Sequence, residues 1–179
     1  MRNIVSGILS LIQHNQTLET NFEKFRPTKC PHCGKSGLWH HGRYDRKADH
    51  ENSGSASLNP VTIPRFYCPH CQHTCSVLPE CIPPRRHYLW LDQEAVLCLL
   101  TTGSSYQSAS QQTKPSRWTV SRWWSRLSSQ FSLCADHIRL LRPSLGRVTT
   151  LSDFWRRLLQ SSALSSVMLS LNNAGVIVP

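Results

Sequence analysis

Two matching cysteine pairs, CPHCG at residues 30–34 and CPHC at residues 68–71, organise the first half of the chain. Each pair places two thiols on one tight turn, so both sulfur atoms can reach the same ion. The 34 residues between the pairs exceed the usual spacer of about 15–20 residues, and a polar segment at 45–60 accounts for the excess. We therefore predict one structural Zn²⁺, closed to reacting water by four thiolates. The ligands would be Cys30, Cys33, Cys68 and Cys71.

The alternative is that these are four unrelated core cysteines. The first residues lack the cleavage site of a signal peptide, which favours metal binding over disulfides. Three histidines near the pairs are alternative ligands, and two within the pairs should face solvent; they are His40, His41 and His73, then His32 and His70. The other four cysteines have no partner at ligand spacing, and we expect each to be a small buried side chain. These are Cys75, Cys81, Cys98 and Cys134.

Hydrophobic spacing predicts an α+β chain in which a small zinc-ribbon β unit precedes an all-α part. We expect a packing helix over 3–26, ended by Pro27, then strands at 37–44, 61–68 and 73–78. Helical spacing follows over 88–130, near 131–141 and near 151–160. The expected segments are an N-terminal helix (1–26), a zinc ribbon with a long mobile loop (27–82, loop 45–60), a helix-turn-helix (83–130) and a helical tail with scope for partial disorder (131–179).

The chain is strongly basic. It has 20 Lys and Arg residues, 15 of them Arg, against 10 Asp and Glu, and its formal net charge is +10. Such a surplus favours an anionic partner, either nucleic acid or a membrane surface. No stretch is apolar enough to span a bilayer, and the best candidate, Leu158–Pro179, contains many polar residues. We therefore expect double-stranded DNA as the partner and no membrane; a basic protein without a polyanionic partner is the alternative.

The segment between Gly103 and Gln130 contains four cations and no acid. Ser116 is placed to cap a helix whose first residue is Arg117, although a cation there costs about 0.3–1 kcal/mol. A nearby phosphate or base edge would explain that placement, because recognition helices read DNA with their N-terminal residues. A solvated basic helix is the alternative. The candidate DNA-contacting residues are Lys114, Ser116, Arg117, Trp118, Thr119, Ser121, Arg122 and Arg126, and the expected core side is Val120, Trp123, Trp124 and Leu127.

These motifs, in this order over residues 20–130, resemble the DNA-binding N-terminal region of bacterial insertion-sequence transposases. The chain is also similar to a bacterial family of unknown function with this arrangement. The long loop resembles an insertion, and Thr113 and Lys114 stand where such motifs often carry Leu and Gly. The matching residues are Cys30, Cys33, Gly34, His41, Gly42, Tyr44, Arg65, Phe66, Cys68, Cys71, Leu78-Pro79, Thr119-Val120 and Trp123.

The resemblance implies binding to transposon ends, but it does not imply that this chain cuts DNA. Transposases of this kind use three carboxylates, and only Asp136 and Asp153 follow the expected helix-turn-helix. We therefore expect a non-enzymatic DNA-recognition part, or an accessory protein, that works with a separate catalytic transposase subunit. It would be cytoplasmic and associated with the bacterial nucleoid, and it could form a homo-oligomer.

Three other functions stay open. A transcription regulator could use the same two modules. A zinc-stabilised protein-interaction module is a different class, and the uncharged segment 158–179 could supply its contact surface. The apolar side chains there stand at helical spacing: Leu164, Val167, Met168 and Leu171. A zinc enzyme is disfavoured because the expected site is closed.

Overall fold

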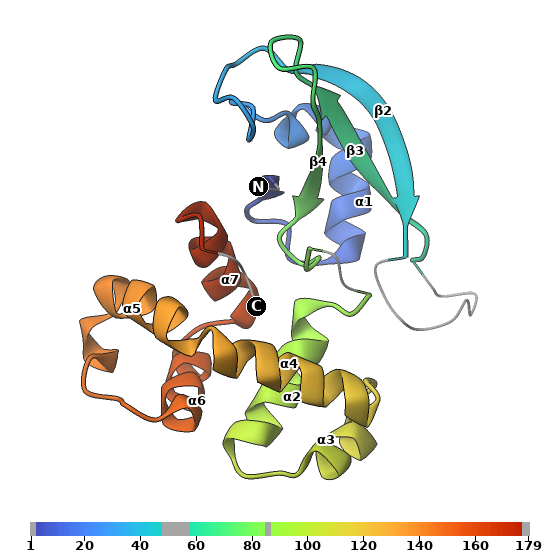
Figure 1. Cartoon of the computed structure of the whole chain (residues 1–179). Coiled ribbons are helices and arrows are strands. Elements are labelled where there is room, and N and C mark those ends of the chain that lie inside the picture. Colours follow the sequence, from blue (N-terminus) through green and yellow to red (C-terminus); the bar gives the residue numbers. More distant parts are fainter. Residues whose placement is uncertain (1–2, 48–57, 85–86, 177–179) are drawn as a thin grey trace. The chain divides into compact units, whose positions relative to one another are not determined.

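The computed structural model describes residues 3–47, 58–84 and 87–176 (Figure 1). The chain divides into two compact units, Met1–Leu89 and Trp90–Pro179. Apolar clusters fill the first unit around a sheet, and a separate cluster fills the helical second unit. The α+β prediction is confirmed in this form: a four-stranded mixed sheet carries the four cysteines, and helices follow it.

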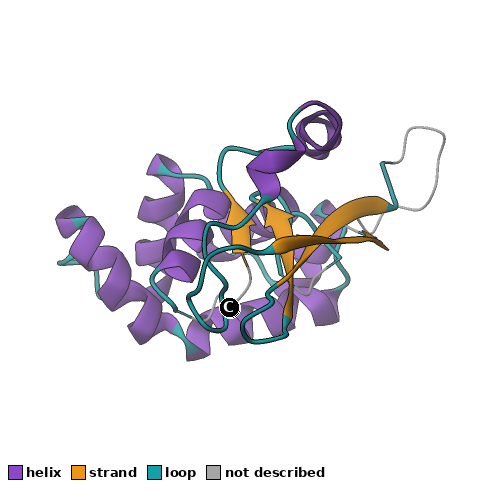
Figure 2. Ribbon diagram, turned by 90° about the horizontal axis from the view of Figure 1, so that it is seen from above, coloured by secondary structure: helices purple, strands orange, loops and turns teal. Residues whose placement is uncertain are grey.

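The sheet of the first unit has the strand order β1-β4-β3-β2. Strands β2 (Trp39–Arg46), β3 (Val61–Tyr67) and β4 (Thr74–Pro79) are antiparallel neighbours, and they confirm the three predicted strands to within two residues. Figure 2 shows β2 and β3 extending together as a twisted hairpin. Residues 48–57 of the expected loop 45–60 lie outside the described residues, whereas Asp45 and Arg46 belong to β2.

The prediction of one helix over 3–26 is wrong at its N-terminal end. β1 (Asn3–Val5) is a strand that pairs in parallel with β4, and Gly7 then turns the chain at φ +74°. Helix α1 begins only at Leu11, after Ser10 caps it, and ends at Thr20; the short 3-10 helix η1 covers Phe22–Phe25. The apolar residues of 3–8 suit a strand equally well, and pairing with β4 decides between the two.

Helix α1 is attached to the sheet through the buried side chain of His14. His14 is fully buried, and its Nε2 lies 2.9 Å from the carbonyl oxygen of Thr62 on β3. Burial lowers the pKa of His14, although the bond to Thr62 opposes this effect. The neutral ring can therefore donate its Nε2 hydrogen to the strand, while its edge packs against Phe25.

The second unit contains the helices that the sequence predicts over 88–160 and one more. Helices α2, α3 and α4 precede α5, the 3-10 helix η2, and then α6 and α7 (Figure 1). Their bounds are Trp90–Thr101, Tyr106–Gln112, Arg117–Ser129, Phe131–Leu141, Pro143–Leu145, Leu151–Ser161 and Leu164–Asn173. Trp90 and Leu97 of α2 share one core with α5–α7, so residues 90–173 pack as one unit.

The tail is part of this core and is not a free contact surface. Leu164, Val167, Met168 and Leu171 are each at most 5% exposed, and they pack with Trp155. The suggestion that they form an interaction surface is therefore wrong. Between residues 131 and 176, helices and the η2 turn cover most of the range. No helix in the described part of the chain is long and apolar enough to cross a membrane.

The burial of the tail predicts a stability difference between two leucines. Leu171→Ala removes a fully buried side chain and should lower the free energy of unfolding by about 2–5 kcal/mol. Leu140→Ala makes the same chemical change at a side chain that is 80% exposed, and should change it by less than about 0.5 kcal/mol. Urea denaturation followed by helical circular dichroism measures both; equal effects would contradict the core position of α7.

Candidate metal centre

The two cysteine pairs meet because β2 and β3 are antiparallel neighbours. Cys30 and Cys33 precede β2, whereas Cys68 and Cys71 lie in the turn that joins β3 to β4. The first residue of β2, Trp39, pairs with Tyr67 at the end of β3, immediately before Cys68. The hairpin register therefore brings the second turn to the first at one end of the sheet.

Both turns have the same backbone geometry. In each, the N–H of the first cysteine donates to the carbonyl of the residue five positions later, at 2.8 Å for Cys30 and 2.9 Å for Cys68. The N–H of the residue after the second cysteine donates back to that first cysteine's carbonyl, at 2.9 Å from both Gly34 and Gln72. Gly34 (φ +73°) and Gln72 (φ +59°) are left-handed, a conformation that only glycine adopts without strain.

The four sulfur atoms match the dimensions of a tetrahedral zinc site. The Sγ atoms of Cys30 and Cys71 are 3.6 Å apart, as are those of Cys33 and Cys68, and all four lie within 4.8 Å of one another. A Zn–S bond of about 2.3 Å in a regular tetrahedron separates two sulfurs by about 3.8 Å. The structure therefore brings the predicted ligand set together as a possible metal site.

The electrostatics of the cluster also favour a cation. Burial opposes a thiolate at Cys30, but the backbone N–H groups of Cys33 and His32 and the nearby thiols outweigh it and lower the pKa of Cys30 to about 6. The N–H of His73 lowers the pKa of Cys71, yet burial and the neighbouring sulfurs raise it to about 12. One thiolate thus disfavours the next, and a divalent ion among the four removes that repulsion.

The described residues place no histidine among the four sulfurs. His32 and His70 are exposed, as predicted, and the ring of His32 stacks on that of His73 with the centroids 4.7 Å apart. His73 instead places Nδ1 2.6 Å from the carbonyl oxygen of Cys71, which supports the turn from outside the cluster. None of the three alternative histidines therefore belongs to the four-sulfur cluster.

The remaining cysteines divide into three buried residues and one exposed residue. Cys75, Cys81 and Cys134 are buried as predicted, and burial raises their pKa values to about 11, 12 and 11. The prediction for Cys98 is wrong, because this residue is exposed on α2. Val96 and Leu97 occupy the buried side of that helix, and the apolar run around Cys98 gave no sign of the difference.

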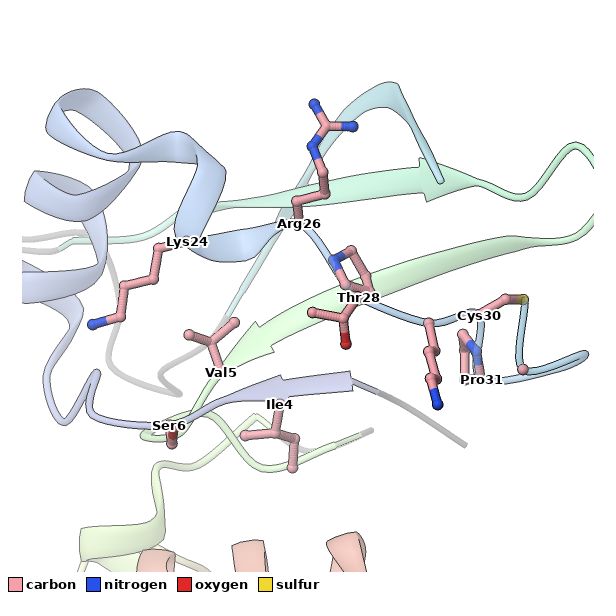
Figure 3. A pocket seen from close by; sticks show the side chains of 11 residues that line it. Ile4, Val5, Ser6, Lys24, Arg26, Thr28, Cys30 and Pro31 are labelled. Carbon is pink, nitrogen blue, oxygen red and sulfur yellow. The ribbon is translucent and has the colours of Figure 1, made fainter. Parts of the chain in front are cut away.

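A groove of about 730 Å³ lies between β1 and the first cysteine turn. Figure 3 shows Ile4 and Val5 on one side of it, with Lys24 and Arg26 on the segment that leads to Cys30. Glu23 engages Arg26 through two hydrogen bonds, and Arg26 also donates to the carbonyl of Leu38. The side chain of Arg26 therefore braces the approach to Cys30 and is not available as a free cation.

The predicted DNA-contacting residues gather on α4 and at the turn before it. Ser116 caps α4 by accepting from the N–H of Thr119 at 3.4 Å, so Arg117 is the first residue, as predicted. Trp118, Arg122 and Arg126 stand four residues apart and are exposed, Trp118 by 78%. The opposite side of the helix is buried through Val120, Trp123 and Leu127, with Trp124 half-buried.

The polar members of the predicted set have other contacts. Lys114 places Nζ 3.6 Å from a carboxylate oxygen of Asp92 on α2, so part of its charge is neutralised within the unit. The hydroxyl groups of Thr119 and Ser116 are hydrogen-bonded to each other, with their oxygen atoms 3.1 Å apart. Ser121 is half-buried. The exposed cations of the set are thus Arg117, Arg122 and Arg126, together with Lys114.

The geometry of the cluster predicts zinc-dependent folding of the first unit. Purified protein should contain one zinc per chain, and Cys68→Ser should lose the metal because three thiolates cannot close the site. Chelation should melt the sheet and leave most of the helical circular dichroism, because α2–α7 have their own core. Elemental analysis and thermal denaturation measure these effects. Cys98→Ser, at an exposed cysteine outside the cluster, is the control; zinc and fold retained in Cys68→Ser would contradict the assignment.

Comparison with known proteins supports one assignment. A family model described as a domain of unknown function (DUF6431) matches residues 30–123, which is more than half of the chain. The match begins at the first cysteine of the cluster and ends at Trp123 in α4, so it includes both cysteine pairs and the α3–α4 turn. No curated protein and no solved structure gives a significant match. The chain belongs to the DUF6431 family.

Proposed function

We propose that this protein binds double-stranded DNA through α3 and α4 and that the four cysteines hold a structural zinc ion. The observation that carries the proposal is the exposed row on α4 formed by Trp118, Arg122 and Arg126, which we call the α4 row. Within the described residues, no hydrogen bond or ion pair engages the guanidinium group of either arginine of this row. Such cations at the surface favour a polyanionic partner.

The local architecture supports this role for α4. Helices α3 and α4 pack against each other across a four-residue turn, residues 113–116, in which Pro115 is buried. Burial of Val120, Trp123 and Leu127 fixes which side of α4 faces the core, and so leaves the α4 row facing outward. Recognition helices in helix-turn-helix proteins enter the major groove with their N-terminal residues, here Arg117 and Trp118.

Charge supports the same conclusion. The segment from Gly103 to Gln130 has no acid, so phosphate can approach α4 without repulsion from its own residues. Arg117 stands at the helix N-terminus, where the helix dipole disfavours a cation. A bound phosphate would offset that cost, and arginine can also read guanine with two hydrogen bonds.

A structural role for zinc follows from the closed set of four sulfurs. Two turns, one from each side of the β2–β3 hairpin, supply all four ligands, and a tetrahedral ion accepts no more. The ion would hold the hairpin ends together beside a small core formed by Phe25, Leu38 and Phe66. In such a unit, metal binding supplies much of the folding free energy.

The finer proposal is a non-catalytic DNA-recognition or accessory protein of a transposable element. It rests on the resemblance described above and on the two acids after α4. Asp136 pairs with Arg139 at 3.2 Å on α5, and Asp153 pairs with Arg156 on α6. Each carboxylate therefore belongs to an ion pair within its own helix, and a separate catalytic subunit would cut the DNA. A cytoplasmic, nucleoid-associated protein fits this role.

The two competing functions make different demands on the molecule. A transcription regulator would bind a promoter through the same α4 row, so only its target sequence separates it from a transposition protein. An interaction module, or a homo-oligomer, would need an exposed apolar surface. Leu133, Leu140 and Leu141 of α5 are 57–80% exposed and are the strongest candidates for one within the described residues.

The proposal predicts a charge-specific loss of binding. Arg122→Ala should weaken binding to duplex DNA from the flanks of the gene and reduce the salt slope of log K by about one, because one phosphate contact is lost. Fluorescence anisotropy over a range of salt concentrations measures both. Arg157→Ala removes the same charge from an exposed position on α6 and should leave the slope unchanged.

Equal losses in Arg122→Ala and Arg157→Ala would mean that only net charge matters and would contradict a recognition role for α4. Absence of duplex binding by the wild-type protein at low salt would overturn the proposed function and favour the interaction module.

A further inference from the structure

One side of the sheet in the first unit is covered at Val61 and Ile63 by an apolar cluster, but it is open at the end next to the four cysteines. Side chains along β3 alternate, so Phe66 points into the apolar cluster while Arg65 and Tyr67 point to the opposite side. The register places Trp39 of β2 and Thr74 of β4 directly beside Tyr67. Directly paired residues share one side of a sheet, so these three side chains lie together on the open side.

Three rings gather at this place. The ring of Tyr67 lies 6.4 Å from that of Trp39 and 5.7 Å from that of His41, measured between centroids. Trp39 is 62% exposed and His41 is exposed, so both present ring surface to solvent. We call Trp39, His41 and Tyr67 the aromatic patch. Single exposed apolar side chains are ordinary, but a group of three adjacent rings is less so.

A fixed cation borders the aromatic patch. Arg65 follows the same side of β3 as Tyr67, and its Nη2 donates to Oγ1 of Thr74 at 3.1 Å. This bond orients the guanidinium and leaves its other N–H groups for further acceptors. Arg43 has a different place: it lies over the ring of Phe22, 4.8 Å from its centroid, on the opposite side of the sheet.

We propose that the aromatic patch binds unpaired bases of single-stranded DNA and that Arg65 contacts the adjoining phosphate. A duplex hides the faces of its bases, whereas a single strand exposes them for stacking on aromatic rings. The net charge of the unit fits this ligand, because residues 24–47 contain seven Lys and Arg against the single acid Asp45, although Arg26 and Arg43 are engaged elsewhere. The choice of DNA rests on the proposed function, but the residues differ from those of the α4 row.

The test compares two ligands of equal charge. Zinc-loaded full-length protein should bind a labelled oligothymidine strand more tightly than an abasic strand of the same length, because only the former can stack. Trp39→Ala should weaken oligothymidine binding about tenfold and reduce the difference between the two strands by a similar factor. Trp39→Phe keeps a ring and should recover most of the affinity. His41→Ala, at a second exposed ring, should give a several-fold loss.

Trp118→Ala is the matched control, since it removes another exposed tryptophan but from the α4 row. It should weaken duplex binding and leave the preference for oligothymidine over the abasic strand intact. Equal wild-type affinity for the two strands would overturn the inference, as would unchanged oligothymidine binding in both Trp39→Ala and His41→Ala with zinc retained. Duplex binding is measured separately, with Arg122→Ala as the test variant. If that duplex experiment contradicts its prediction, it overturns the proposed function alone and leaves the single-strand inference standing.

Discussion

Four sulfur atoms lie together at one end of a sheet, where two turns that are 34 residues apart in the sequence meet. This arrangement depends on the β2–β3 register, because a shift of one residue would place Trp39 and Tyr67 on opposite sides of the sheet and displace Cys68 from Cys30. The same register decides which side chains meet the core. Phe66 therefore packs beside Cys68, while Tyr67, between them in the chain, faces outward.

The helical unit obeys a comparable constraint. Burial of Val120, Trp123 and Leu127 fixes the rotation of α4, and the arginines four residues apart are then exposed together. The tail completes the core that holds α2, so the helices after α4 support the candidate DNA-binding surface instead of presenting one of their own. Packing thus selects the surface that is available to a ligand, and side-chain chemistry selects the ligand.

The local patterns were sufficient for several predictions. Cysteine spacing identified the four members of the cluster, Ser116 was identified as the cap of α4, and alternation or helical spacing located β2–β4 and α2–α6. These features depend on neighbours within a few residues, where the chain geometry is nearly the same in any fold. The family match over residues 30–123 includes both the cysteine pairs and the α3–α4 segment, and its description assigns no activity.

The wrong predictions concern residues whose local sequence is compatible with two different structures. Ile4 and Val5 are compatible with a helix or a strand, and their parallel pairing with β4 decides in favour of the strand. Cys98 and Leu171 both lie in apolar runs, yet Cys98 is exposed whereas Leu171 is fully buried, because neighbouring helices cover only Leu171. By itself, the sequence determined the four-cysteine cluster, the charge and most of the helices and strands. Tertiary structure alone decided which faces are covered, since burial depends on contacts between residues far apart in the chain.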